Sequence, residues 1–82
     1  PARYLAKAFA AKEAFAKACG TGLRPPVTLR NIAVLRNTLG KPRFECAPEL
    51  MGWLAERGVT SHHVSLSDEG DLVLAYVILE QS

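Results

Sequence analysis

The sequence predicts an α+β fold in a single small domain, residues 1–82, with three helices followed by a C-terminal antiparallel β-hairpin. Three observations support this prediction. The chain begins with an alanine-rich segment, glycines and prolines divide its middle, and its last third alternates between polar and apolar residues before becoming wholly apolar. A chain of 82 residues can form one core, but it buries only about 60% of its unfolded surface, so a partner chain would add stability.

The first helix is predicted over Arg3–Cys19, which contains seven alanines and no proline or β-branched residue. Its apolar residues recur near one side at helical spacing, so we expect that side to be buried. Gly20 follows as a stop signal. The side expected in the core comprises Leu5, Ala8, Phe9, Phe15, Ala16 and Cys19.

A second helix is predicted over Leu29–Leu39, after a connection rich in glycine and proline at Gly20–Pro26. Thr28 is placed to cap its N-terminus. Gly40, with a proline two residues later, is typical of a helix end. The inward face of this helix would consist of Leu29, Ile32, Leu35 and Leu39.

The third helix is predicted over Pro48–Arg57. Proline suits the first turn of a helix, Glu49 complements the positive end of the helix dipole, and Gly58 ends the segment. Before this helix, Arg43 to Cys46 alternate as an edge strand does, so a short strand within Lys41–Cys46 is an optional element.

A β-hairpin is predicted at the C-terminal end of the chain. Its first strand includes Val64 and Leu66 between polar neighbours, and Asp68–Gly70 supplies the turn. The second strand, Leu72–Leu79, is apolar on both faces, so something must cover the second face. We expect a second copy of the chain to do so, which predicts a homodimer. Its interface residues would be Trp53, Leu72, Leu74, Tyr76 and Ile78.

Three helices followed by a hairpin is also the element order of a winged-helix domain, whose third helix enters the major groove of DNA. The charges disagree with that mode of docking. The third helix carries two glutamates, and the tip of the hairpin carries Asp68, Glu69 and Asp71, which phosphate would repel. The winged-helix-like order is therefore an architectural analogy only.

Charge is divided sharply along the chain. Pro1–Arg43 contains nine of the ten lysines and arginines and one acid, Glu13, whereas Phe44–Ser82 contains seven acids and one base. The resulting formal charges of +8 and −6 add to the net charge of +2. Such asymmetry indicates a basic surface directed at an anionic partner.

We expect that partner to be nucleic acid, contacted through its phosphates by a small regulatory or accessory protein. Two alternatives remain open: an ordinary solvated face, and a homodimeric protein-interaction module, an adaptor or inhibitor, that binds an acidic protein. The residues predicted to contact phosphate are Lys7, Lys12, Lys17, Arg24, Arg30, Arg36, Lys41 and Arg43.

The sequence shows no catalytic or metal-binding motif, which predicts a protein that is not an enzyme and holds no metal or cofactor. His62 and His63 are neighbours on a strand, so their side chains point to opposite faces and cannot join one ligand set. Cys46, near a helix N-terminus, is a better candidate for a reactive thiol than Cys19, although a weak one. Both thiols are expected to be free.

The longest apolar run, Leu72–Leu79, is far shorter than the ~20 residues of a membrane-spanning helix. No targeting segment is visible in the sequence. A cytoplasmic location without a membrane partner is therefore expected.

Overall fold

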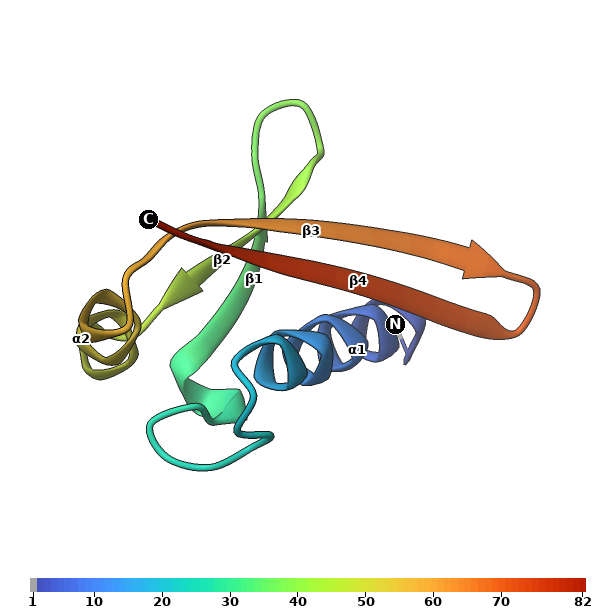
Figure 1. The fold of residues 1–82 in the computed structure, drawn as a ribbon. Coiled ribbons are helices and arrows are strands. Elements are labelled where there is room, and N and C mark those ends of the chain that lie inside the picture. Colours follow the sequence, from blue (N-terminus) through green and yellow to red (C-terminus); the bar gives the residue numbers. More distant parts are fainter. Residues whose placement is uncertain (1) are drawn as a thin grey trace.

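The computed structural model describes residues 2–82, and the side chains of residues 5–82. Two α-helices and four strands form there, and the strands pair as two antiparallel hairpins (Figure 1). The fold is α+β, but the predicted arrangement of three helices and one hairpin, with its winged-helix-like order, is wrong. In chain order the elements are α1 (Ala2–Ala18), the 3-10 turn η1 (Leu29–Asn31), β1 (Ile32–Arg36), β2 (Pro42–Cys46), α2 (Pro48–Glu56), β3 (Val59–Glu69) and β4 (Leu72–Gln81).

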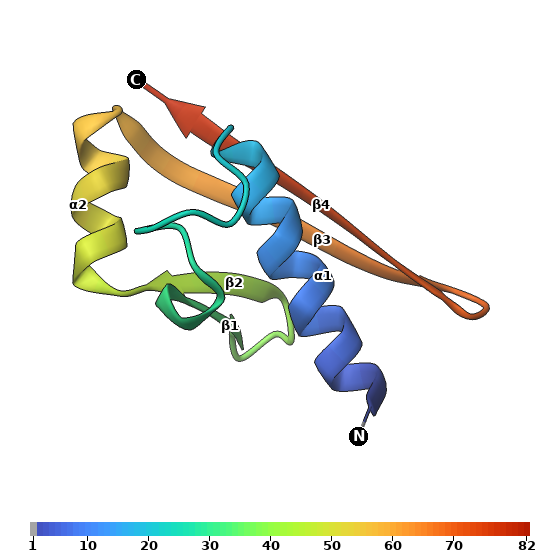
Figure 2. The same cartoon turned by 90° about the horizontal axis from the view of Figure 1, so that it is seen from below.

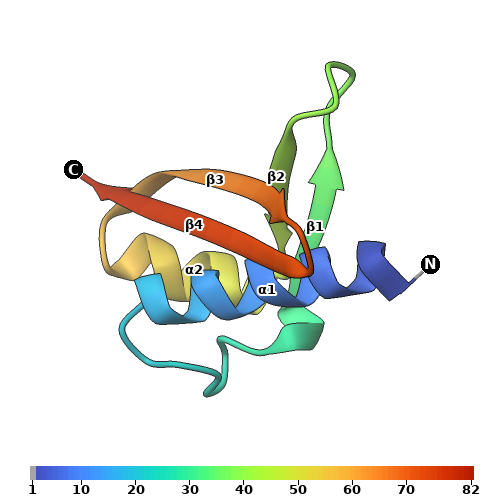
Figure 3. The ribbon, with the colours of Figure 1, turned by 90° about the vertical axis from the view of Figure 1, so that its right-hand side faces the viewer.

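The two hairpins cross each other steeply, and α1 lies along one face of the long β3–β4 hairpin (Figures 1 and 2). The β1–β2 hairpin projects beyond the layer that β3 and β4 form (Figure 3). α2 follows β2 and lies near the start of β3, on the far side of the core from the N-terminal end of α1 (Figure 2). This arrangement gathers residues from every element around one buried cluster.

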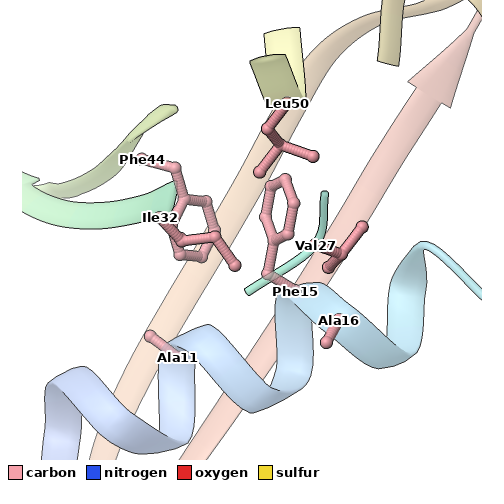
Figure 4. Close-up of a cluster of buried hydrophobic side chains, with 7 residues drawn as sticks. All are labelled: Ala11, Phe15, Ala16, Val27, Ile32, Phe44 and Leu50. Carbon is pink, nitrogen blue, oxygen red and sulfur yellow. The ribbon is translucent and has the colours of Figure 1, made fainter. Parts of the chain in front are cut away.

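The buried cluster lies where α1, the two hairpins and α2 meet (Figure 4). Phe15 of α1 is its central side chain, 1% exposed, and its ring meets the edge of the Phe44 ring at a centroid distance of 4.8 Å. Edge-to-face aromatic pairs of this kind add to the stabilisation that burial alone provides. The complete cluster is Ala11, Phe15, Ala16, Val27, Ile32, Phe44 and Leu50.

α1 confirms the predicted first helix, but only part of its predicted buried side is correct. Leu5 and Phe9 are 66% and 49% exposed, whereas Phe15 is buried. The N-terminal end of α1 extends past the β1–β2 hairpin (Figures 2 and 3). Among the described residues, no helix is both long and apolar enough to cross a membrane.

The predicted second helix, Leu29–Leu39, is wrong. Thr28 caps only the single turn η1, accepting a hydrogen bond from the backbone N–H of Asn31 at 3.3 Å, and the chain then continues as β1. β1 pairs with β2 along its whole length, from Ile32 opposite Cys46 to Arg36 opposite Pro42. Pairing with the next strand along the chain therefore overrides the helical spacing of the leucines.

The other predicted elements are present with small changes in length. The optional strand is β2, and the predicted third helix is α2, which ends one residue earlier, at Glu56. Gly58 and Gly70 have φ angles of 74° and 64°, which glycine adopts without strain at the end of α2 and in the β3–β4 turn. The hairpin itself is confirmed, with strands longer than predicted.

β4 has one covered face and one exposed face. α1 packs against β4, and the inward residues Val77 and Leu79 contact the core cluster. The outward residues are 44% to 74% exposed: Leu72, Leu74, Tyr76 and Ile78. α1 therefore covers one apolar face of β4, and the other apolar face is exposed in this structure.

We expect Phe15→Ala to lower the free energy of unfolding by about 3–5 kcal/mol, because it empties the centre of the core. The matched control is Phe9→Ala on the same helix, which should cost less than about 1 kcal/mol because Phe9 is half exposed. Urea unfolding followed by circular dichroism measures both losses. Equal losses would contradict the described packing of α1.

Candidate functional site

The outer side of α1 carries one carboxylate and one ammonium group a single turn apart. Because Phe15 faces the core, Glu13 and Lys17 are left exposed, and their spacing of four residues puts them on the same side of the helix. Lys12 directly precedes Glu13, the only acid in Pro1–Arg43. Glu13 is absent from the residues predicted to bind a ligand, although its position among lysines on an exposed helix side marks it.

Two of the α1 lysines connect the helix to the rest of the fold. Lys12 Nζ donates a hydrogen bond to the Leu29 carbonyl at 3.2 Å, and Lys7 Nζ lies 2.8 Å from the Asp68 carboxylate. The Lys7–Asp68 pair joins the basic and acidic parts of the chain. Lys17 remains exposed on α1.

A cavity of about 250 Å³ lies between α1, β1 and β3. Two predicted phosphate-binding residues that are distant in sequence, Lys7 and Arg36, both line it. Its remaining walls are the apolar residues Ala8, Val34, Leu35 and Leu66. A cavity with two cations and apolar walls suits a ligand that joins an anionic group to an apolar one.

The β1–β2 hairpin carries three of the predicted cations on its projecting end (Figure 3). Its loop is closed by Asn37, whose Oδ1 accepts hydrogen bonds from the backbone N–H groups of Leu39 and Lys41. Arg36 also donates to the Gly40 carbonyl at 2.7 Å. The structure thus brings Arg36, Lys41 and Arg43 onto one hairpin, whereas Arg24 lies in the connection before η1 and Arg30 lies in η1.

A larger cavity of about 430 Å³ opens between α2, β2 and β3. His62 lines it, and His62 Nε2 accepts a hydrogen bond from the backbone N–H of Phe44 at 3.0 Å. Burial lowers the pKa of His62 below its usual 6.5, with smaller contributions from His63 and Arg43. The ring is therefore neutral near pH 7.

His62 and His63 point to opposite faces of β3, as predicted. His63 Nε2 lies 2.9 Å from Glu80 Oε1, which also accepts a hydrogen bond from Ser61 Oγ at 2.6 Å. These contacts lower the pKa of Glu80, Ser61 contributing most. In the part of the chain that the structure describes, no group of three His, Cys, Asp or Glu side chains could hold a metal ion.

The two cysteines are free thiols, and neither is activated. Burial raises the pKa of Cys19 to about 11, with a further rise from Cys46 and a small opposing effect of Arg57. Burial also raises the pKa of Cys46. The predicted activation of Cys46 by the start of α2 is therefore wrong, because desolvation of the thiolate prevails.

The predicted interface residues do not form one surface. Trp53 is half-buried against the core cluster, and the Arg57 guanidinium lies 3.7 Å from the centroid of its ring. Trp53 shares a cavity with Leu79, on the covered face of β4, whereas Ile78 and its companions point the other way. The homodimer itself stays a prediction.

Comparison with known proteins shows similarity over nearly the whole chain. The family model described as the 4'-phosphopantetheinyl transferase superfamily matches residues 1–77. A holo-acyl-carrier-protein synthase from Thiobacillus denitrificans is 74% identical over 82 residues, which are 100% of this chain and 63% of that protein. One from Nitrosomonas eutropha is 58% identical, over 99% of this chain and 65% of that protein. The chain thus spans slightly less than two thirds of these relatives.

Solved structures agree with this similarity. The crystal structure of holo-acyl-carrier-protein synthase from Neisseria meningitidis is 54% identical and superposes with a TM-score of 0.96, over 99% of this chain and 65% of that one. The acyl carrier protein synthase of Mycobacterium tuberculosis is 39% identical, with a TM-score of 0.79, over 99% of this chain and 71% of that one. Both share the fold of two helices and two crossed hairpins.

We expect Cys19 to react with iodoacetamide about a hundredfold more slowly in the folded chain than in urea at pH 8. Its pKa of about 11, against an ordinary value of 9.0, lowers the thiolate fraction by about that factor. The rate is measured in the unchanged chain by mass spectrometry of the peptide that carries Cys19, because Cys46 contributes to this pKa. Similar rates in folded and unfolded chains would contradict the burial of this thiol.

Proposed function

Because this chain belongs to the 4'-phosphopantetheinyl transferase superfamily, we propose that it takes part in transferring a phosphopantetheinyl group onto an acyl carrier protein, as a holo-acyl-carrier-protein synthase. The observation that carries this proposal is the joint agreement of sequence and fold with the Neisseria enzyme over almost the whole chain. Because the relatives are longer than this chain, their activity, donor and acceptor are proposals for it.

The functional predictions from sequence are corrected by the same comparisons. The prediction of a nucleic-acid-binding protein is wrong, and so is the alternative of an adaptor or inhibitor. The expectation of a protein without enzymatic activity is also wrong, because the matched family consists of transferases. Nucleic acid is likewise not the partner. The basic half of the chain led to this error because phosphates of a small donor and phosphates of nucleic acid attract the same side chains.

We propose coenzyme A as the donor, because it joins 4'-phosphopantetheine to a nucleotide through a pyrophosphate bridge. An acceptor hydroxyl oxygen of the carrier protein forms a bond to the phosphorus of the phosphopantetheine. The bond between this phosphorus and the bridging oxygen of the pyrophosphate breaks. The nucleotide leaves with the bridging oxygen and the other phosphate of the bridge, and a base must accept the hydroxyl proton. A site for this reaction needs cations around the phosphates and a group that can take the proton.

The outer side of α1 supplies both requirements. Lys17 is placed to neutralise phosphate charge, and Glu13, one turn away on the same side of the helix, is placed to accept a proton. The cavity lined by Lys7 and Arg36 begins on the same helix, so its cations and apolar walls could hold further parts of the donor. Among the predicted phosphate contacts we therefore assign the donor to Lys7, Lys17 and Arg36. The other predicted contacts stay predictions: Lys12, Arg24, Arg30, Lys41 and Arg43.

The proposal is tested by incubating the natural polypeptide that carries this chain with coenzyme A and an acyl carrier protein. Mass spectrometry should show the carrier protein gaining one phosphopantetheinyl group. A carrier protein that keeps its mass, while the N. meningitidis enzyme modifies it in parallel, would contradict the proposed activity.

Glu13→Gln should lower kcat/KM by about a hundredfold or more, because the amide keeps the shape of the side chain but cannot accept a proton. Lys17→Ala should chiefly raise the KM for coenzyme A, because it removes a phosphate contact. Glu56→Gln, the same change of side chain at the exposed end of α2, is the matched control and should leave both parameters unchanged. Steady-state kinetics decide the question, and a fully active Glu13→Gln variant would remove Glu13 from the site.

A further inference from the structure

A hydrogen bond to a side chain connects the two hairpins. Neighbouring strands are ordinarily connected by a ladder of backbone hydrogen bonds. β2 and β3 belong to separate two-stranded sheets, although they contact each other. The backbone N–H of Phe44 on β2 donates to Nε2 of His62 on β3 at 3.0 Å. The imidazole thus takes the place of a backbone carbonyl at the crossing of the hairpins.

This hydrogen bond exists in only one protonation state of His62. A neutral imidazole has one donor nitrogen and one acceptor nitrogen, so acceptance at Nε2 requires the proton to be on Nδ1. An imidazolium carries protons on both nitrogens and accepts nothing. Protonation would therefore leave the N–H of Phe44, a residue only 4% exposed, facing another donor. An unpaired buried donor is costly for a folded protein.

The bond also lies at one end of a chain of packed rings. The His62 ring is 5.2 Å from the Phe44 ring, centroid to centroid, and Phe44 packs edge-on against Phe15 of α1 at 4.8 Å. Figure 4 shows Phe15 and Phe44 side by side at the centre of the core. A change at His62 thus reaches the helix that carries Glu13 and Lys17 through two direct contacts.

We propose that His62 is a pH-sensitive clasp: its neutral ring holds the β1–β2 hairpin against the β3–β4 hairpin, and its protonation releases that contact. The inference does not depend on the proposed enzymatic function, because it concerns how the two hairpins are held together.

The charged groups around the ring favour its neutral form. β2 contributes Arg43, Glu45 and Cys46 to the cavity beside His62, and His63 is its neighbour in the chain. Arg43 opposes a positive ring, and its guanidinium lies 3.9 Å from the exposed Glu45 carboxylate. The other elements facing the cavity contribute no titratable group there: Phe15 from α1, Met51, Leu54 and Ala55 from α2, and Leu79 from β4.

The lowered pKa of His62 sets the direction of the pH dependence. The unfolded chain takes up a proton near pH 6.5, whereas the folded chain takes it up only at a lower pH. The stabilisation is therefore complete above pH 6.5 and is lost as the pH falls from there through the pKa of the folded state. Each unit of difference between the two pKa values reduces the folding equilibrium constant tenfold at low pH.

The test compares His62→Gln with the unchanged chain, because the glutamine amide oxygen can occupy the position of Nε2 and accepts a hydrogen bond at any pH. Urea midpoints are measured from pH 7.5 to pH 5. We expect the midpoint of the unchanged chain to fall on acidification and that of His62→Gln to fall clearly less. His63→Gln is the control, which removes the exposed ring and should keep most of the pH dependence, because burial is the main cause of the lowered pKa of His62. Equal pH dependence in all three chains would overturn the proposal.

A second measurement avoids mutation. Nitrogen NMR shifts of the His62 ring in the unchanged protein should show the proton on Nδ1 at pH 7.5. The protection of the Phe44 amide against hydrogen exchange should fall as the His62 ring titrates. A proton on Nε2 at pH 7.5, or a Phe44 protection factor that is constant across the titration, would overturn the proposal even if His62→Gln failed to fold.

Discussion

The packing of Phe15 against Phe44 is the contact on which the rest of the structure depends. The two hairpins share no strand ladder, so α1 and its central aromatic ring hold them in one body. Aromatic rings suit this role because they bury a large apolar area from one position of the chain. With the inner side of α1 committed to that contact, its outer side is left to polar and charged residues.

That division of α1 links the fold to the proposed chemistry. The residues that anchor the helix alternate with the ones that face outward, so Glu13 and Lys17 flank Phe15 in sequence but lie on the other side of the helix. Lys7 and Lys12 also bond to distant parts of the chain, which restricts how α1 can rotate. A site built on such a helix is held more firmly than one built on loops.

Sequence reasoning succeeded where local signals were strong. Alanine content marked α1, Pro48 and Gly58 marked the ends of α2, and polar alternation marked β3. It failed at residues 29–39, because leucines at helical spacing coincide there with β-branched residues, and only β2 decides between the two structures. For the site, the predicted phosphate contacts stay predictions, and Glu13 was passed over although its position among lysines was a local signal.

The sequence by itself determined the helix content of the first segment, the hairpin at the end, and the uneven distribution of charge, because each depends on residues close together in the chain. The tertiary structure alone decided that β1 is a strand, that Leu5 and Phe9 are exposed, and that His62 bonds to Phe44. These outcomes depend on contacts between different elements of the fold, whose energies the pattern within one element does not record.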